Sequence, residues 1–323
     1  MNELSPSPNI SPVSHPQRAL DKKRLAPWFW PDDELSDAVK IRQTIYLQNQ
    51  IRVLNTSDND PRVLAASQQL LNLQAHYLSE HFPDKYSIEH SRTFGKVIIN
   101  KANKNKIDAF SMDSTKSDWH PLAISGMLSQ EDICIVKRKK CGRQVLVAGF
   151  LATPTNWSLS DFMQADMDSI HKNVAGYDKP VNGTRKYKLK DTVDKVLESI
   201  REYPDGIICR NNQFIEYVDT LALAPGETKE YDTNNIENNP GDSIYLRSER
   251  ETLTRLPKPY DDFTIFTIKP HVFKMTDVQS LRGDDFARAV INNSVLGSAL
   301  KVTKNDRTIS LINPLKQYLT VTK

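Results

Sequence analysis

IYLRSERETLTRLP, residues 244–257, is the stretch that decides the fold. Alternate side chains of a β-strand point to the same side, so an extended conformation here places Arg247, Glu249 and Glu251 on one face. The next segment, FTIFTI at 263–268, is apolar or β-branched throughout and predicts a buried neighbouring strand. The charged row is therefore expected beside the core of an antiparallel sheet.

Two interpretations of this charged row fit the pattern. The first is the solvated face of an antiparallel sheet, where a surface pair between Arg247 and Glu249 contributes little to stability. The second is an arginine and a carboxylate that line a pocket, where their environment adapts them to chemistry.

Upstream of this stretch the sequence predicts helices. Apolar spacing indicates one helix over 37–54 and another that begins at Pro61, with Asp60 as its N-cap. Residues 101–118 are polar and predict a loop.

The middle of the chain changes its hydrophobic period. Residues 133–136 and 145–151 predict a β-hairpin in which Gly142 supplies a positive φ. Ser158 is expected to cap a helix whose apolar stripe ends near His171. A second helix is expected near 190–201 and a strand at 214–223.

The order of these elements predicts the α+β class: an antiparallel sheet with flanking helices and an N-terminal helical portion, not a doubly wound parallel sheet. Residues 1–26 are rich in Ser, Pro and charge, which indicates a disordered or draped arm. The large side chains at 28–31, WFWP, are expected to anchor that arm. Residues 27–323 are expected to form a single domain.

Composition narrows the class of protein. The chain of 323 residues is 38% hydrophobic and 26% charged, as is ordinary for a globular protein, and its net charge of +3 is too small to indicate nucleic-acid binding. No apolar run approaches the length of a membrane span, and the three cysteines show no C-x-x-C spacing. A cytoplasmic protein with no nucleic-acid or membrane partner is predicted.

Four blocks carry a resemblance to a known family. The stretch from Arg247 resembles the R-x-E-R-Q-T-L-x-R-L-P…F-T-I signature of the haem-dependent oxidative N-demethylase family. Three more blocks occur in the family's order: QEDIC at 130–134 for QEDLC, IHKNVAGY at 170–177 for I-H-x-P-V-P-G-Y, and RNN at 210–212 for R-x-N-W. The resemblance spans roughly residues 60–275.

The resemblance implies a PAS-like haem domain that binds haem b. The implied reaction is oxidative N-demethylation of a small N-methylated secondary amine with dioxygen, which releases carbon at the formaldehyde level. A separate subunit that carries flavin and an iron–sulfur centre is the implied reductase. Two alternatives stay open: a haem-binding PAS-like sensor, and a divergent member that has lost demethylase activity.

The resemblance also suggests which residues hold haem. His171 is the candidate axial ligand of the iron, although a histidine at a helix end is also a common C-cap. Arg210 and Arg250 are candidate partners of the haem propionates, as is Arg255. Tyr177 could donate a hydrogen bond within the pocket or could simply pack there.

Glu249 is the candidate catalytic carboxylate. An amine is mostly cationic near neutral pH, so a buried carboxylate could hold the cation and then accept its proton. Arg247 could keep this carboxylate ionised or could itself bind a propionate.

The chain departs from the family pattern at several positions. Lys269-Pro270-His271 stands where the family continues R-T-Y, and Gln213 stands where it has Trp. Asn173 and Ala175 replace two prolines of the I-H-x-P-V-P-G-Y block. Roles that the family gives to these positions do not carry over to this chain.

Overall fold

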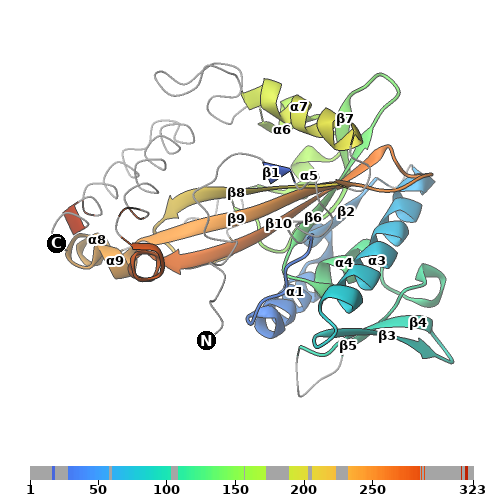
Figure 1. Cartoon of the computed structure of the whole chain (residues 1–323), viewed down its shortest axis with the longest axis horizontal. Helices are drawn as coiled ribbons and strands as arrows, with labels where there is room; N and C mark the ends of the chain where they lie inside the picture. Colours follow the sequence, from blue (N-terminus) through green and yellow to red (C-terminus); the bar gives the residue numbers. More distant parts are fainter. Residues whose placement is uncertain are drawn as a thin grey trace.

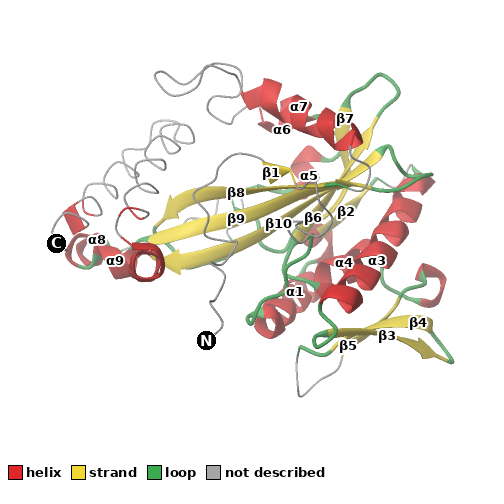
Figure 2. Ribbon diagram, viewed as in Figure 1, coloured by secondary structure: helices red, strands yellow, loops and turns green. Residues whose placement is uncertain are grey.

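The computed structural model describes residues 17–18, 28–57, 60–102, 108–155, 157–171, 189–202, 206–222 and 232–283, with isolated positions at 285, 287, 314 and 317–318. Within these ranges helices accompany two antiparallel sheets (Figure 2). The predicted α+β class is confirmed.

The larger sheet has seven strands in the order β1-β8-β9-β10-β6-β7-β2, all paired antiparallel. Their bounds are β1 Gln17–Arg18, β2 Leu54–Thr56, β6 Asp132–Arg138, β7 Gln144–Phe150, β8 Ile207–Glu216, β9 Tyr245–Arg255 and β10 Phe263–Lys274. The smaller sheet contains β3 Tyr86–Ser91, β4 Gly95–Asn100 and β5 Asp108–Ser111. The long strands β9 and β10 lie next to each other in the larger sheet.

Helices lie on both sides of the larger sheet (Figure 1). Their bounds are α1 Leu35–Gln48, α2 Gln50–Val53, α3 Pro61–His81, α4 Pro121–Leu128, α5 Leu159–Phe162, α6 Met167–His171, α7 Leu189–Glu202, α8 Thr233–Asn238 and α9 Pro240–Ser243. A short 3-10 helix covers Ser114–Lys116, and a further helix covers residues 275–283.

The strongest local signals are confirmed. Helix α3 begins at Pro61, and the side chain of Asp60 accepts a hydrogen bond from the backbone N–H of Arg62. Strands β6 and β7 form the predicted hairpin, with Gly142 at a φ of +90°. In this left-handed region glycine avoids the steric cost that a Cβ would bring.

Four element predictions need correction. The helix over 37–54 is divided at Asn49, whose side chain caps α2. The predicted loop at 101–118 contains β5, because pairing with β4 supplies the hydrogen bonds that its own polar sequence does not signal. The long helix after Ser158 is two short ones, α5 and α6, and the Ser158 hydroxyl contacts Ser160 instead of capping. Strand β8 begins at Ile207, seven residues before the predicted strand.

The two faces of the larger sheet pack against different elements. On the face that we name the α3 face, Ile133, Ile135, Phe263 and Ile265 belong to the main core with residues of α1, α3 and α4. On the opposite face, named the α7 face, Cys134 and Phe266 pack with residues of α5 and α6. Figure 1 shows α6 and α7 on one side of the sheet and α1, α3 and α4 on the other.

The segment 28–33 is tied to the α3 face. Phe29 is fully buried and Trp28 nearly so, and the backbone N–H of Trp28 donates to the hydroxyl of Tyr77. These large side chains therefore anchor the segment 28–33, and their anchoring of residues 1–26 stays a prediction. Upstream, Gln17–Arg18 pair with β8 as β1, and the other residues before Trp28 lie outside the described part of the chain. The division of the chain into an arm at residues 1–26 and a domain at residues 27–323 stays a prediction.

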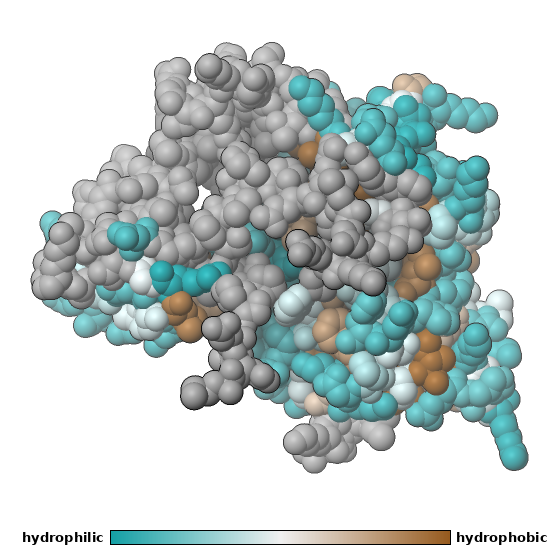
Figure 3. All heavy atoms as spheres, viewed as in Figure 1, coloured by the Kyte–Doolittle hydropathy of each residue, from teal (hydrophilic) through white to brown (hydrophobic). Residues whose placement is uncertain are grey.

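The described surface in Figure 3 is mostly hydrophilic and interrupted by small apolar patches. Exposed large apolar side chains occur on several elements, for example Ile51 on α2 and Leu64 on α3. In the part of the chain that the structure describes, no helix combines the length and apolar character of a membrane span.

Candidate functional site

The charged row on β9 is buried on the α7 face. The side chain of Arg247 is 2% exposed and that of Glu251 is 6% exposed, whereas Glu249 retains 15%. The interpretation of this row as a solvated face is therefore wrong. Because burial of unpaired charge is costly, each of these groups needs a partner.

Two ion pairs supply these partners. Nε of Arg247 donates to Oε1 of Glu249 at 2.9 Å within the strand. Arg210 on β8 lies opposite Glu251 in the sheet register and donates to its Oε2. Although burial opposes the effect, the Glu251 carboxylate raises the pKa of the Arg210 guanidinium. The side chain of Arg210 is 37% exposed, so this pair lies at the margin of the buried row.

The guanidinium of Arg247 binds three separate parts of the chain. Besides the bond to Glu249, Nη1 donates to the carbonyl of Leu221 at 2.8 Å and Nη2 to the carbonyl of Thr153 at 3.1 Å. Every nitrogen of the group thus has a protein acceptor. These bonds use three of the five N–H donors of the guanidinium, and they suit the group to hold Glu249 in place.

Thr153, which accepts from Arg247, is itself held by Asp132 at the start of β6. The Asp132 carboxylate accepts from the N–H groups of Ala152 and Thr153 and from the Thr153 hydroxyl. Arg42 on α1 forms a 2.8 Å ion pair with the Asp132 carboxylate, and both side chains are almost fully buried.

His171 ends α6 on the same side of the sheet. Its Nδ1 lies 2.8 Å from the carbonyl oxygen of Met167. In the tautomer that donates this hydrogen bond, the lone pair of the ring is on Nε2. Burial lowers the pKa of His171, and the charges of Arg210 and Glu251 also act on it. The imidazole is therefore neutral at physiological pH and lies within electrostatic reach of the charged row.

An apolar cluster adjoins these polar groups. Phe266, whose register partner Leu253 follows Glu251 by two residues, shares the face of the charged row. Phe266 and Ile170, the residue before His171, both pack against this cluster. The rest of the cluster consists of Cys134, Leu146, Leu151, Trp157, Leu159, Phe162 and Met163. Burial raises the pKa of Cys134 to about 12, so this thiol is protonated and acts as a packing group.

Two predicted site residues are not brought to this face. Arg250 alternates with Glu249 and Glu251, so it points to the α3 face, where its Nη1 donates to the carbonyl of Trp28. Tyr177 lies outside the described residues. Of the predicted set, the structure brings together Arg247, Glu249, Arg210 and His171.

The α3 face carries a second buried network around Lys269. Nζ of Lys269 donates to the carbonyl of Trp30 and to Oδ2 of Asp32. Burial lowers the pKa of Lys269, and the nearby carboxylates of Glu131 and Asp32 oppose that effect. Where the family signature has Arg, this chain has a lysine that holds the segment 28–33 through these two bonds.

The QEDIC block anchors the same segment. Gln130 exchanges side-chain and backbone hydrogen bonds with Asp32, and Oε1 of Glu131 accepts from the N–H of Trp30. Sequence reasoning did not assign these roles, nor those of Asp132 and Glu251. Of these residues, only Glu251 could have been found from the sequence, because the alternation along β9 places it on the same face as Arg247 and Glu249.

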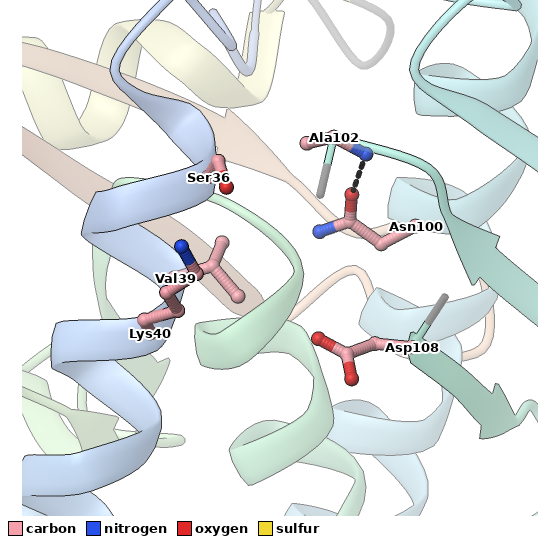
Figure 4. Close-up of a pocket in the computed structure, with 6 residues that line it drawn as sticks. All are labelled: Ser36, Val39, Lys40, Asn100, Ala102 and Asp108. Carbon is pink, nitrogen blue, oxygen red and sulfur yellow. Dashed lines mark hydrogen bonds between the residues drawn. The ribbon is translucent and has the colours of Figure 1, made fainter. Parts of the chain in front are cut away.

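A small cleft lies elsewhere, between α1 and the smaller sheet (Figure 4). Its lining consists of Ser36, Val39, Lys40, Asn100, Ala102 and Asp108. Its volume of about 10 Å³ suits a single water molecule. The cleft is thus too small for haem and contains none of the predicted site residues.

Comparison with known proteins decides the family. The sequence model for haem-dependent oxidative N-demethylase, alpha subunit-like proteins matches residues 19–295. The chain belongs to this family. Membership indicates a haem-dependent oxidative N-demethylase-like function, and the words alpha subunit imply other subunits. No curated protein matches the chain significantly.

The α7 face fits a haem in chemical terms. A metal-binding histidine commonly donates its second ring nitrogen to a backbone carbonyl, as His171 can donate to Met167. The neutral imidazole is the form that binds iron, and the cluster around Phe266 offers apolar contact for a porphyrin. Among the described residues no group of three or more His, Cys, Asp or Glu side chains could hold a metal ion.

Proposed function

We propose that the chain catalyses oxidative N-demethylation of a small N-methylated secondary amine at haem b. The observation that supports this proposal is the meeting of His171, Arg210, Arg247 and Glu249 on one sheet face beside an apolar cluster. The overall change consumes the amine, dioxygen, two electrons and two protons. Its products are the demethylated amine, formaldehyde and water.

In this proposal His171 binds the iron and Arg210 binds a propionate. The haem, when bound, supplies the activation of dioxygen. Because Arg210 is 37% exposed and shares its charge with Glu251, it can reach a carboxylate at the margin of the site. Tyr177 retains its predicted role as a hydrogen-bond donor in the pocket.

Glu249 binds the substrate cation and accepts its proton. A protonated amine has no lone pair, so oxidation at nitrogen or its methyl group requires deprotonation first. Glu249 is partly exposed on a buried row, which makes it reachable by a small cation. Arg247 holds the carboxylate in place through Nε, while Nη1 donates to the carbonyl of Leu221 and Nη2 to the carbonyl of Thr153.

The two electrons come from a separate reductase that carries flavin and an iron–sulfur centre. The chain contains three cysteines and no glycine-rich dinucleotide motif, so its sequence offers neither a four-cysteine cluster nor a nicotinamide site. This gap agrees with the alpha-subunit-like description of the family. A PAS-like haem domain is part of the same proposal.

Two measurements test this function. The purified protein, supplied with haem, should show a Soret band. With a reductase, NADPH and dimethylamine, it should release formaldehyde in step with NADPH oxidation. A Soret band without formaldehyde release would favour the haem sensor, and absence of haem binding would overturn both functions.

A further inference from the structure

Asp132 belongs to the QEDIC block and is almost completely buried at the first residue of β6. Its carboxylate accepts from the N–H of Ala152 at 2.9 Å, from the N–H of Thr153 at 3.0 Å and from the Thr153 hydroxyl at 2.8 Å. These three bonds fix the backbone that follows β7. Arg42 supplies the countercharge at 2.8 Å, so the buried carboxylate is fully paired.

The carbonyl of Thr153 links this fixed backbone to the candidate site through a hydrogen bond. It accepts from Nη2 of Arg247 at 3.1 Å, although the two residues are 94 positions apart. Nε of the same guanidinium donates to Glu249 at 2.9 Å. A planar guanidinium has fixed angles between its donors, so a shift of the Thr153 carbonyl rotates the donor that holds Glu249.

We propose that Asp132 is a positioning residue for Glu249, acting through the peptide of Thr153 and the guanidinium of Arg247. The inference rests on the proposed function for its catalytic consequence. Asp132 itself contacts neither substrate nor haem. Its effect arises because a carboxylate that must meet a small cation is sensitive to displacements of about 1 Å.

Three substitutions separate this role from simple stabilisation. Asp132→Asn keeps the side-chain shape but turns one acceptor into a donor facing other donors. Thr153→Val is nearly isosteric and removes only the hydroxyl bond to Asp132. Arg42→Lys is the matched control, because it disturbs the other partner of Asp132 and leaves the path through Thr153 in place.

The full-length, haem-loaded protein is assayed with dimethylamine as the probe. We expect Asp132→Asn to raise KM about tenfold and Thr153→Val about threefold, at unchanged haem content. Arg42→Lys should lower the melting temperature without changing KM. A loss of folded protein lowers kcat alone, so a raised KM identifies a displaced Glu249.

A second measurement needs no turnover. In urea unfolding, the effects of Asp132→Asn and Glu249→Gln on the unfolding equilibrium should be non-additive by at least about threefold, as is typical of residues in one network. If Asp132→Asn does not fold, Thr153→Val replaces it in both measurements.

The outcomes distinguish failure of this inference from failure of the proposed function. If Glu249→Gln weakens amine oxidation but neither Asp132→Asn nor Thr153→Val raises KM, the positioning role is overturned. If Glu249→Gln has no effect on turnover, the catalytic role of Glu249 fails, and the unfolding measurement alone decides. Additive effects there overturn the inference, and non-additive effects support it.

Discussion

Arg247 and Glu249 are joined by a 2.9 Å hydrogen bond between Nε and Oε1 within a single strand. Residues two apart on a strand share a face, and here both are turned into the protein instead of toward solvent. The guanidinium also donates to two backbone carbonyls, those of Leu221 and Thr153. In the proposed mechanism the glutamate is the member of the pair that meets the substrate.

Glu249→Gln should lower amine oxidation about 100-fold, because the variant keeps shape and hydrogen bonding but loses the general base. Haem content, measured from the Soret absorbance, should not change. The matched control is Glu89→Gln, which removes an exposed carboxylate from β3 of the smaller sheet. Full activity of Glu249→Gln would remove this residue from the mechanism.

His171→Ala should abolish or strongly shift the Soret band while far-UV circular dichroism stays near native. His76 provides a close control, because its Nδ1 also lies near the carbonyl four residues earlier, at 2.7 Å, but on the exposed side of α3. His76→Ala should leave the haem spectrum unchanged. An unaltered spectrum in His171→Ala would show that another group binds the iron.

Deletion of residues 1–26 should change the melting temperature little. The described contact that it removes is the two-residue pairing of Gln17–Arg18 with β8. Trp28→Ala should behave oppositely and cost about 3–5 kcal/mol, because a large buried aromatic side chain is lost. Thermal unfolding of both variants measures the contrast, and a large loss on deletion would make the arm part of the core.

The free energy of unfolding should fall in mild acid because of His271. Burial lowers the pKa of His271 to about 3; the Lys269 and Arg250 cations add to this effect, and Asp32 opposes it. An unfolded histidine titrates near 6.5, so between pH 6.5 and about 3 the unfolded state binds a proton that the folded state does not. Stability is therefore fully present above pH 6.5 and decreases as the pH falls through this window.

From pH 7 to pH 5 this single group should contribute a loss of about 2 kcal/mol. Urea unfolding of the wild-type protein and of His271→Gln at both values measures it. The variant should show the smaller loss, whereas His76→Gln, at an exposed histidine, should match the wild type. Equal losses in the wild type and His271→Gln would contradict the assignment.

Local signals predicted the elements that they govern. The cap at Asp60, the positive φ at Gly142 and the alternation along β9 each act over a few residues, and each is confirmed. The start of strand β8 was predicted too late because the middle of the strand contains Asn211, Asn212 and Gln213, which lack the apolar alternation of an ordinary strand. These polar residues lie opposite the charged part of β9, so the pattern is weakest where the site is.

The contacts that hold Arg247 in the candidate site could not be predicted from the spacing of residues in the sequence. Asp132 meets Thr153 across 21 residues, and Thr153 meets Arg247 across 94. No periodicity within either segment specifies such a meeting, since it depends on how β6, β7 and β9 assemble. The resemblance identified the QEDIC block, but only the geometry shows what its carboxylates contact.

Strand β9 carries charged side chains on both faces of the sheet. Arg247, Glu249 and Glu251 lie on the α7 face, whereas Arg250 lies on the α3 face and contacts the carbonyl of Trp28. Insertion or loss of one residue would exchange the two sets and leave charges without partners on both faces at once. The sequence of this strand can therefore change only by substitution without insertion or deletion, and each substitution of a charged residue requires a matching change in its partner. Glu251 is an example of such a substitution: it stands where the family signature has glutamine, and its charge is paired with Arg210.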